Sequence, residues 1–302
     1  MNTNIYWPVY KNIENEFNNI MFYIHIDDTQ ISVYSSKISD LILRSSAEIE
    51  SISKELYLLN GGPKTINIKY DEDAISFLNS KWSLEEKTII ISSYNCFLTN
   101  REIYPFKKNE TRTGSNRMTY SWNNSYQNLK HDRAHSLHFG SVKYLLDAMA
   151  ALFLLNIYYK DITFKLKKDA EASNFDASLG SSIFSIKLHH NRSVSLGNTY
   201  EKSPDFNQCT YFLKSSDETL DKLKKAYEVV EQKAWEATTN QITEKIIKTQ
   251  ETDTEKIIKI IEDTQSTYQK ENINKMMKAE AVNLGRLFME LEYEALLNKN
   301  QI

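Results

Sequence analysis

Residues 142–159 read VKYLLDAMAALFLLNIYY and form the most apolar helical stretch of the chain. Polar residues that can cap the first turn of a helix lie upstream, at positions 123–125. Apolar residues recur at helical spacing from Trp122 to about Tyr159. The sequence therefore predicts one long central helix over residues 122–159, with the rest of a helical body packed around it.

This apolar stretch is too short between charges to cross a membrane. Its longest charge-free apolar run is Ala148 to Leu155, and Lys143 and Asp147 interrupt the approach to it. A spanning helix needs ~20 predominantly apolar residues. The first 17 residues, MNTNIYWPVYKNIENEF, also do not have the basic, apolar and small-residue succession of a signal peptide. We therefore expect neither a membrane-spanning helix nor a membrane partner.

Three amphipathic helices are predicted before the central one. The first carries Ile13, Phe17, Ile20 and Ile24 at helical spacing. The second covers residues 36–59. The third, DEDAISFLNSKW over residues 71–82, begins with acids that suit the positive end of a helix dipole. Because the chain has only seven glycines and four prolines, an all-β fold is disfavoured, and residues 1–165 predict a mainly α helical bundle.

Two segments between the third helix and the central one are not helical in pattern. TIIISS, residues 88–93, and the segment after it to Pro105 predict a short strand or an extended loop, and KKNETRTGSN, residues 107–116, predicts a polar loop. Residues 166–215 change character again, because SSIFSIKLHH, SVSL and CTYFLKS alternate in the way strands do. We predict a small β-containing insert there.

A long helical C-terminal arm is predicted over residues 216–302. From Phe206 to the last residue the sequence has no proline and a single glycine, Gly285, so this tract is predicted to be nearly all helix. One continuous helix of this length would reach ~120 Å at 1.5 Å per residue. We therefore expect at least one break and a helical hairpin or coiled-coil pair.

Charge and cysteine content bear on whether the protein binds nucleic acid and on its cellular location. The 302 residues carry 37 basic and 40 acidic side chains, a net charge of -3, which excludes a global basic field for nucleic acid. Residues 101–133 are locally basic, with seven basic and three acidic side chains. The two cysteines, Cys96 and Cys209, form neither a disulfide framework nor a metal spacing. A reducing, cytoplasmic location is the expectation.

The basic stretch ends in an R-x4-H pair, Arg133 and His138, where the central helix turns apolar. Several amphipathic helices precede the pair, and residues 126–133 read YQNLKHDR. These features resemble the HEPN superfamily of small helical-bundle proteins, whose ribonuclease members carry an R-x4-6-H motif on a late helix. The phrase also looks like the YN-x-x-KH-x-R type found in uncharacterised bacterial HEPN-like and abortive-infection proteins. The resemblance covers about residues 10–160.

The resemblance implies a metal-independent endoribonuclease of toxin or antiphage-defence type, with RNA, possibly tRNA, as substrate and with no cofactor. His138 would act as general acid or base, and Arg133 would stabilise the charge that develops on the phosphate. The family assembles such a site at the interface of a homodimer. Supporting roles in the same groove are expected for Glu48, His131 and Asp132.

Other interpretations of these residues stay open. Ala134 follows the motif arginine where the family usually has a polar residue, and Lys130 with His135 is an alternative pair. On a helix, His131, His135 and His138 would also form an H-x3-H-x2-H face that could bind zinc or another divalent ion. The alternative function is a noncatalytic HEPN-like interaction module of a bacterial defence or toxin–antitoxin system, whose C-terminal helices bind a protein partner.

Overall fold

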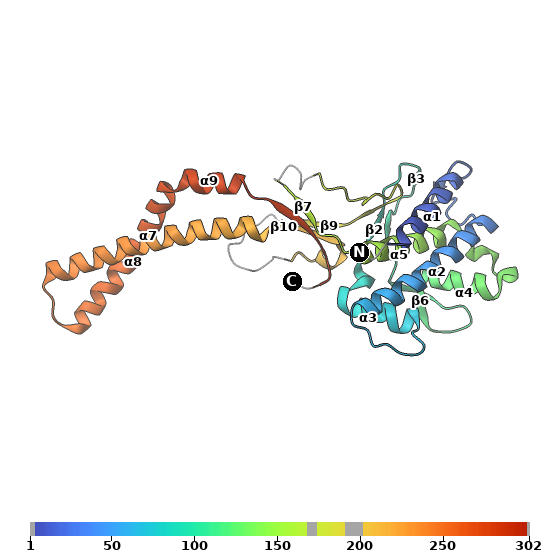
Figure 1. Ribbon diagram of the computed structural model, residues 1–302, viewed down its shortest axis with the longest axis horizontal. Helices are drawn as coiled ribbons and strands as arrows, with labels where there is room; N and C mark the ends of the chain where they lie inside the picture. The colour runs from blue at the N-terminus through green and yellow to red at the C-terminus, as the bar shows by residue number, and fades with distance from the viewer. Residues whose placement is uncertain (1–3, 168–173, 191–201, 301–302) are drawn as a thin grey trace.

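The computed structural model describes residues 4–167, 174–190 and 202–300, and it has a globular body from which a helical arm projects (Figure 1). The chain is mainly α, as predicted. The α-helices of the described residues are α1 (Tyr6–Ile20), α2 (Ser36–Leu59), α3 (Ile75–Trp82), α4 (Ser121–His131), α5 (Val142–Lys160), α7 (Asp217–Thr249), α8 (Thr254–Ala279) and α9 (Ala281–Met289).

Short strands make up four small sheets. In chain order they are β1 (Ile26–Asp27), β2 (Ile89–Ile91), β3 (Cys96–Phe97), β4 (Glu102–Ile103), β5 (Lys108–Thr111), β6 (Met118–Tyr120), β7 (Phe164–Leu166), β8 (Phe184–Ile186), β9 (Leu188–His190), β10 (Tyr211–Ser215) and β11 (Tyr293–Leu297). The predicted strand in TIIISS is β2. The predicted polar loop at 107–116 is wrong in part, because β5 pairs antiparallel with β6 there.

The centre of the body is α5, whose residues Ala148 to Tyr158 are all buried. It packs against α1, α2 and α4, so apolar side chains are covered on every side of the helix. By length and composition alone α5 could cross a membrane, yet 78% of its apolar window is buried inside the body. The apolar stretch thus forms the core around which the other helices pack.

The helices predicted before α5 are present. The second, α2, has the predicted bounds, and the Ser35 hydroxyl accepts a hydrogen bond of 3.1 Å from the backbone N–H of Ile38 at its start. The first, α1, ends at Ile20, so Ile24 lies beyond it. One π-helical turn, Tyr70–Ala74, leads into α3.

The predicted continuous helix over residues 122–159 is wrong, because residues 132–141 leave the helix between α4 and α5. We call residues 132–141 the connector. It contains two single turns of 3-10 helix, Arg133–His135 and Leu137–Phe139. The first backbone N–H groups of α5 bond outside the helix, from Val142 to Val33 at 3.0 Å and from Lys143 to Ile31 at 2.9 Å. These bonds satisfy donors that a helix start leaves free, so a separate helix begins there.

Strands from the predicted insert pair with distant parts of the chain. β8 pairs antiparallel with β2, which also pairs with β4. A second sheet has the order β7-β11-β10-β9. Its strand β11 lies in the tract predicted to be nearly all helix, so that prediction is wrong at the C-terminal end. The predicted strand SVSL, residues 193–196, lies outside the described residues.

The arm leaves and re-enters the body at adjacent strands. Antiparallel pairing joins Ser215 of β10 to Tyr293 of β11, and the backbone N–H of Ser216 bonds to the carbonyl of Glu292 at 2.8 Å. Residues 217–291, with α7, α8 and α9, are therefore inserted between two neighbouring strands (Figure 1). The expected break and hairpin are confirmed, since α7 ends at a left-handed Gln250 and α8 packs back along it.

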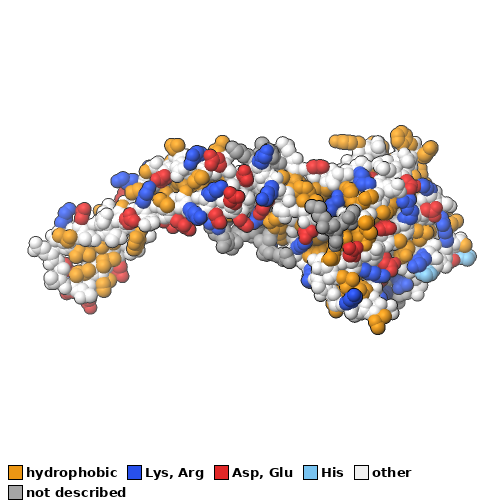
Figure 2. Space-filling view, in the orientation of Figure 1, with side chains coloured by type: hydrophobic (Ala, Val, Ile, Leu, Met, Phe, Trp, Pro, Cys, Tyr) orange, Lys and Arg blue, Asp and Glu red, His pale blue; other side chains and the backbone are white. Residues whose placement is uncertain are grey.

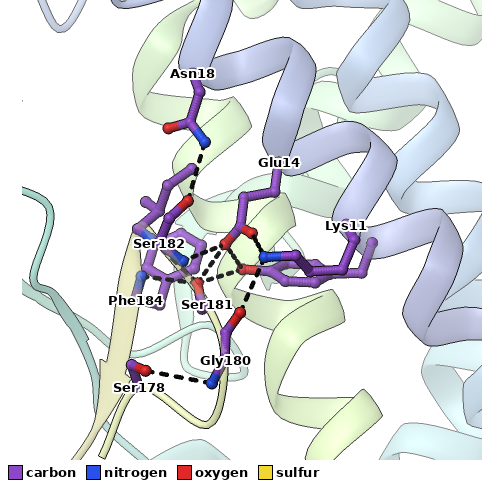
Figure 3. Close-up of polar contacts among 10 residues, drawn as sticks. Lys11, Glu14, Asn18, Ser178, Gly180, Ser181, Ser182 and Phe184 are labelled. Carbon is purple, nitrogen blue, oxygen red and sulfur yellow. Dashed lines mark hydrogen bonds and ion pairs between the residues drawn. The ribbon is translucent and has the colours of Figure 1, made fainter.

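A buried carboxylate ties α1 to the loop before β8 (Figure 3). Glu14 is fully buried, and its Oε1 accepts hydrogen bonds from the Tyr10 hydroxyl at 2.9 Å, the Ser182 backbone N–H at 3.0 Å and the Ser181 hydroxyl. Lys11 pairs with its other oxygen. Burial, with the adjacent carboxylate, raises the pKa of Tyr10 well above its usual value. The carboxylate is thus fully hydrogen-bonded inside the body.

Candidate functional site

The connector is held in place from three directions. The Ser125 hydroxyl donates to the carbonyl of Phe139 at 2.7 Å, and the backbone N–H of Ser35 bonds to the carbonyl of Gly140 at 3.2 Å. Gly140 itself packs against Ser39 of α2, where an added Cβ would lie only 2.0 Å from the serine Oγ. A side chain at position 140 would therefore require the Ser39 side chain or the connector to shift.

Arg133 binds α2 rather than the motif histidine. Its Nη2 donates to Oδ1 of Asp40 at 3.1 Å and to the carbonyl of Ser36 at 3.4 Å. The exposed imidazole of His138 packs on the ring of Phe139, with 4.4 Å between ring centroids. Arg133 and His138 make no hydrogen bond, ion pair or ring contact with each other within the described residues. Within one copy of the chain, the R-x4-H pair therefore makes no direct polar or ring contact.

The supporting residues near the pair have local partners. Asp132 Oδ1 lies 2.7 Å from Nδ1 of His135, and this hydrogen bond raises the pKa of the imidazole. The Lys130 ammonium donates to the Tyr126 hydroxyl at 3.3 Å and lies 5.1 Å from the centroid of its ring. His131 ends α4 with an exposed side chain.

Glu48 is not brought to the connector. It lies two helical turns beyond Asp40 on α2, about 12 Å along the axis at 1.5 Å per residue. Burial raises the pKa of the Glu48 carboxyl, which the charge of Arg44 partly offsets. The pKa of the Tyr6 phenol of α1 is raised by burial and by Glu55, and the charge of Glu48 adds to that rise. Glu48 therefore belongs to the α1–α2 contact.

The alternative of a histidine metal site depended on a helix through residues 131–138. The break after His131 removes the shared helical face. Over residues 4–167, 174–190 and 202–300, no three His, Cys, Asp or Glu side chains lie close enough together to hold a metal ion.

Much of the basic stretch at 101–133 is engaged within the chain. The Arg101 guanidinium donates to the backbone carbonyls of Ile91 and Cys96. Arg117 pairs with Glu72 at 2.6 Å. Lys107 and Lys108 lie over the rings of Tyr104 and Tyr120 in turn, at 5.6 and 5.5 Å from the centroids. Of these contacts only the Arg117 pair sets a carboxylate against the cation, so Lys107 and Lys108 keep their positive charge at the surface.

A cleft in the body contains a titratable group that sequence reasoning did not select. The cavity of about 440 Å³ lies between the residue 98–109 loop and α5, and Asp147 lines it. Burial raises the pKa of Asp147 to about 6, although the Ser121 hydroxyl donates to its carboxylate. At neutral pH such a carboxyl can exchange a proton. The signal in the sequence was the interruption of the apolar stretch at position 147.

The arm is well packed only near the body. Leu223 and Val230 of α7 pack with Leu284 of α9 and with Leu291 in a small apolar cluster. Farther out, the contact between α7 and α8 is polar. The Asn272 amide donates to Thr238 Oγ1 and to Gln241 Oε1, both at 2.9 Å.

Isoleucines gather beyond this polar layer, at the end of the arm farthest from the body. None of the seven is buried: Ile242, Ile246, Ile247, Ile257, Ile258, Ile260 and Ile261. Ile247 is 68% exposed and Ile258 49%. Figure 2 shows hydrophobic side chains on the surface of this end of the arm. We call these seven residues the isoleucine tip. Sequence periodicity found the hairpin but could not show that its apolar seam stays uncovered.

Comparison of the chain with protein-family models, with curated proteins and with solved structures finds no match.

Proposed function

We propose that this chain is a noncatalytic interaction module whose helical arm pairs with the arm of a second copy. The observation that carries the proposal is the isoleucine tip at the end of a projecting hairpin. Full burial of one isoleucine side chain contributes about 1.5–3 kcal/mol, so two exposed and five half-buried isoleucines at one site favour association. The HEPN resemblance supplies the setting, a bacterial defence or toxin–antitoxin system.

A second copy fits the arm for three reasons. Two hairpins packed together form a four-helix bundle, which gives each isoleucine tip an apolar neighbour. Acidic and basic side chains are mixed around the tip, as at Glu244, Lys245, Glu255 and Lys256, so the same surface can face itself without strong repulsion. A polar layer such as that at Asn272 can also set the register of packed helices. Twofold self-pairing is the commonest oligomeric arrangement.

The test is the solution mass of the full chain with charges placed on the isoleucine tip. We expect the wild type to reach twice its monomer mass of 35.2 kDa at micromolar concentration in sedimentation equilibrium. The double variant Ile247→Asp/Ile258→Asp should dimerise at least about 100-fold more weakly, because two apolar contacts are lost and two charges are buried.

The matched control adds the same two charges at exposed polar positions of the same helices, Thr243→Asp/Ser266→Asp. This variant should dimerise like the wild type. A wild type that stays at 35.2 kDa at all concentrations, or a control as weak as the isoleucine variant, contradicts pairing through the tip.

The second candidate function is the metal-independent endoribonuclease, acting through Arg133 and His138 brought together from two copies. The observation in its favour is that the His138 imidazole is exposed and that Arg133 is held near the surface, by an ion pair with Asp40 and a 3.4 Å hydrogen bond to the Ser36 carbonyl. Such a pair contributes at most about 1 kcal/mol, so a phosphate can displace it.

Incubation with total RNA and with tRNA, with and without EDTA, tests this activity. Cleavage by the wild type should survive EDTA and fall by about 10²- to 10⁴-fold in Arg133→Ala and in His138→Ala, because each removes a positioned catalytic group. His25→Ala, which changes a histidine outside the connector, should cleave at the wild-type rate. Equal cleavage by all four proteins, or none, argues against this second function.

A further inference from the structure

A cavity of about 540 Å³ lies between the last turn of α5, strands β7 and β10 and the loop at residues 174–179. Its volume falls within the range of pockets that bind small molecules. The walls are mostly apolar and include Ile162, Phe164, Leu166, Phe175, Leu179 and Tyr211.

One amine lies among these apolar walls. Lys160, the last residue of α5, lines the cavity and is half-buried. Its Nζ lies 3.0 Å from the centroid of the Trp7 ring, a cation–π contact. No carboxylate of the described residues pairs with it. Asp176, the other charged residue in the lining, accepts a hydrogen bond of 2.9 Å from the backbone N–H of Ser178.

A lysine in the last turn of a helix also stabilises the helix dipole, and this is the alternative explanation for Lys160. Lysines with only that role usually keep the ammonium in water. Here burial, and then the charge of Lys11, lowers the pKa of Lys160 to about 8. The amine is therefore held in an apolar setting that disfavours its charge, and an anion in the cavity would stabilise it.

We propose that this cavity binds an amphipathic carboxylate, with its apolar chain against Phe164, Phe175 and Leu179 and its carboxylate on the Lys160 ammonium. Aromatic and aliphatic walls favour a hydrocarbon chain, and the unpaired amine selects an anionic head group over a neutral or cationic one. The site is separate from the isoleucine tip and from the connector, so it stands independently of the proposed functions.

Calorimetric titration of the full chain with decanoate tests this assignment. We expect saturable binding at one site, no comparable binding of decyltrimethylammonium, and weaker binding of decanol. Lys160→Met should weaken decanoate binding by about 10- to 100-fold, the contribution of one charge-assisted hydrogen bond, and leave decanol binding unchanged. Lys143→Met, an exposed lysine at the other end of α5, is the control and should bind decanoate like the wild type.

The pH profile separates binding by the amine from a purely structural role. Lys11, Asp176 and the Tyr211 phenol are the titratable groups around Lys160, and the Tyr211 hydroxyl donates to the carbonyl of Ile162 at 2.7 Å. Because the amine has a pKa of about 8, its cation is present below that pH, and decanoate binding should weaken about tenfold per pH unit above it. Lys160→Arg keeps its charge, so its binding should stay flat to pH 10.

Three results overturn the proposal. Equal decanoate affinity in the wild type and in Lys160→Met shows an apolar cavity with no role for the amine. The absence of saturable binding shows that the cavity is not a site for such a ligand. If Lys160→Met is destabilised, which its unfolding temperature would reveal, the comparison of wild type with Lys160→Arg across pH still decides the matter. The same pH dependence in both proteins assigns the titration to another group.

Discussion

Replacing Glu14 by alanine is expected to lower the free energy of unfolding by about 3 kcal/mol, the largest effect of any single substitution outside the apolar core. The change removes a fully buried carboxylate and leaves the Ser182 N–H without its acceptor (Figure 3). The Tyr10 and Ser181 hydroxyls also lose this acceptor, and because they lie 2.8 Å apart only one of them can donate to the other. Lys11, which keeps partial access to water and donates to the carbonyl of Gly180 at 2.9 Å, moderates the loss.

Thermal unfolding measures this loss directly. For a chain of this size we expect the midpoint to fall by roughly 5 °C. Glu14→Gln should lower the free energy of unfolding by a smaller amount, because the amide oxygen can still accept from the hydroxyls. It should still be less stable than the wild type, because the neutral amide does not balance the charge of Lys11.

Glu16, on the same helix, provides the control. It pairs with Lys37 and with Arg44 near the surface, and these cations lower the pKa of its carboxyl. Glu16→Ala should lower the free energy of unfolding by about 1 kcal/mol at most, since surface ion pairs contribute little. If the two alanine variants unfold alike, the cluster around Glu14 does not anchor the residue 178–182 loop to α1.

Excision of the arm is expected to leave a folded body that no longer dimerises. Residues 217–291 are replaced by Asn-Gly, so that Ser216 and Glu292 flank a two-residue turn. Because β10 and β11 are already paired antiparallel up to Ser215 and Tyr293, this turn closes an ordinary hairpin. The helical signal should fall sharply, since α7, α8 and α9 contribute 33, 26 and 9 helical residues.

Two measurements separate the outcomes. Trp82 and Trp122 are buried in the body, so their fluorescence reports its unfolding after the arm is removed, and the midpoint should stay within about 5 °C of the wild type. Sedimentation should show a monomer at concentrations where the full chain is a dimer. A body that unfolds on excision would show that the arm is part of the core; a dimer that persists would place the interface elsewhere.

The C-terminal end of the arm shows why sequence pattern alone could not define its limits. Residues 206–302 read as helix because proline is absent and glycine almost so. Tyr293–Leu297 nevertheless form β11, the strand between β7 and β10. Strand pairing with residues far away in the chain outweighs the local helical preference here, because it buries Ala295 completely.

The connector shows that sequence pattern alone could not define the candidate site either. Helical periodicity runs through residues 132–141, and the R-x4-H spacing was interpreted on a helix. The structure places Arg133 and His138 on separate single turns, and Arg133 pairs with Asp40, which lies 93 positions away in the sequence. A motif defined by spacing gives the order of two side chains, but their separation in space depends on what their backbone packs against.

The sequence by itself determined the mainly α class, the helices α1 to α3, the buried helix α5 and the hairpin of α7 and α8. These features follow from periodicity, which is a local property of the chain. Only the tertiary structure decided the break before α5, the strand β11, the burial of Glu14 against Ser181 and the position of Lys160 over Trp7. Each of these depends on residues about 100 or more positions apart or on backbone groups that bond outside their own helix, and no local pattern records such partners.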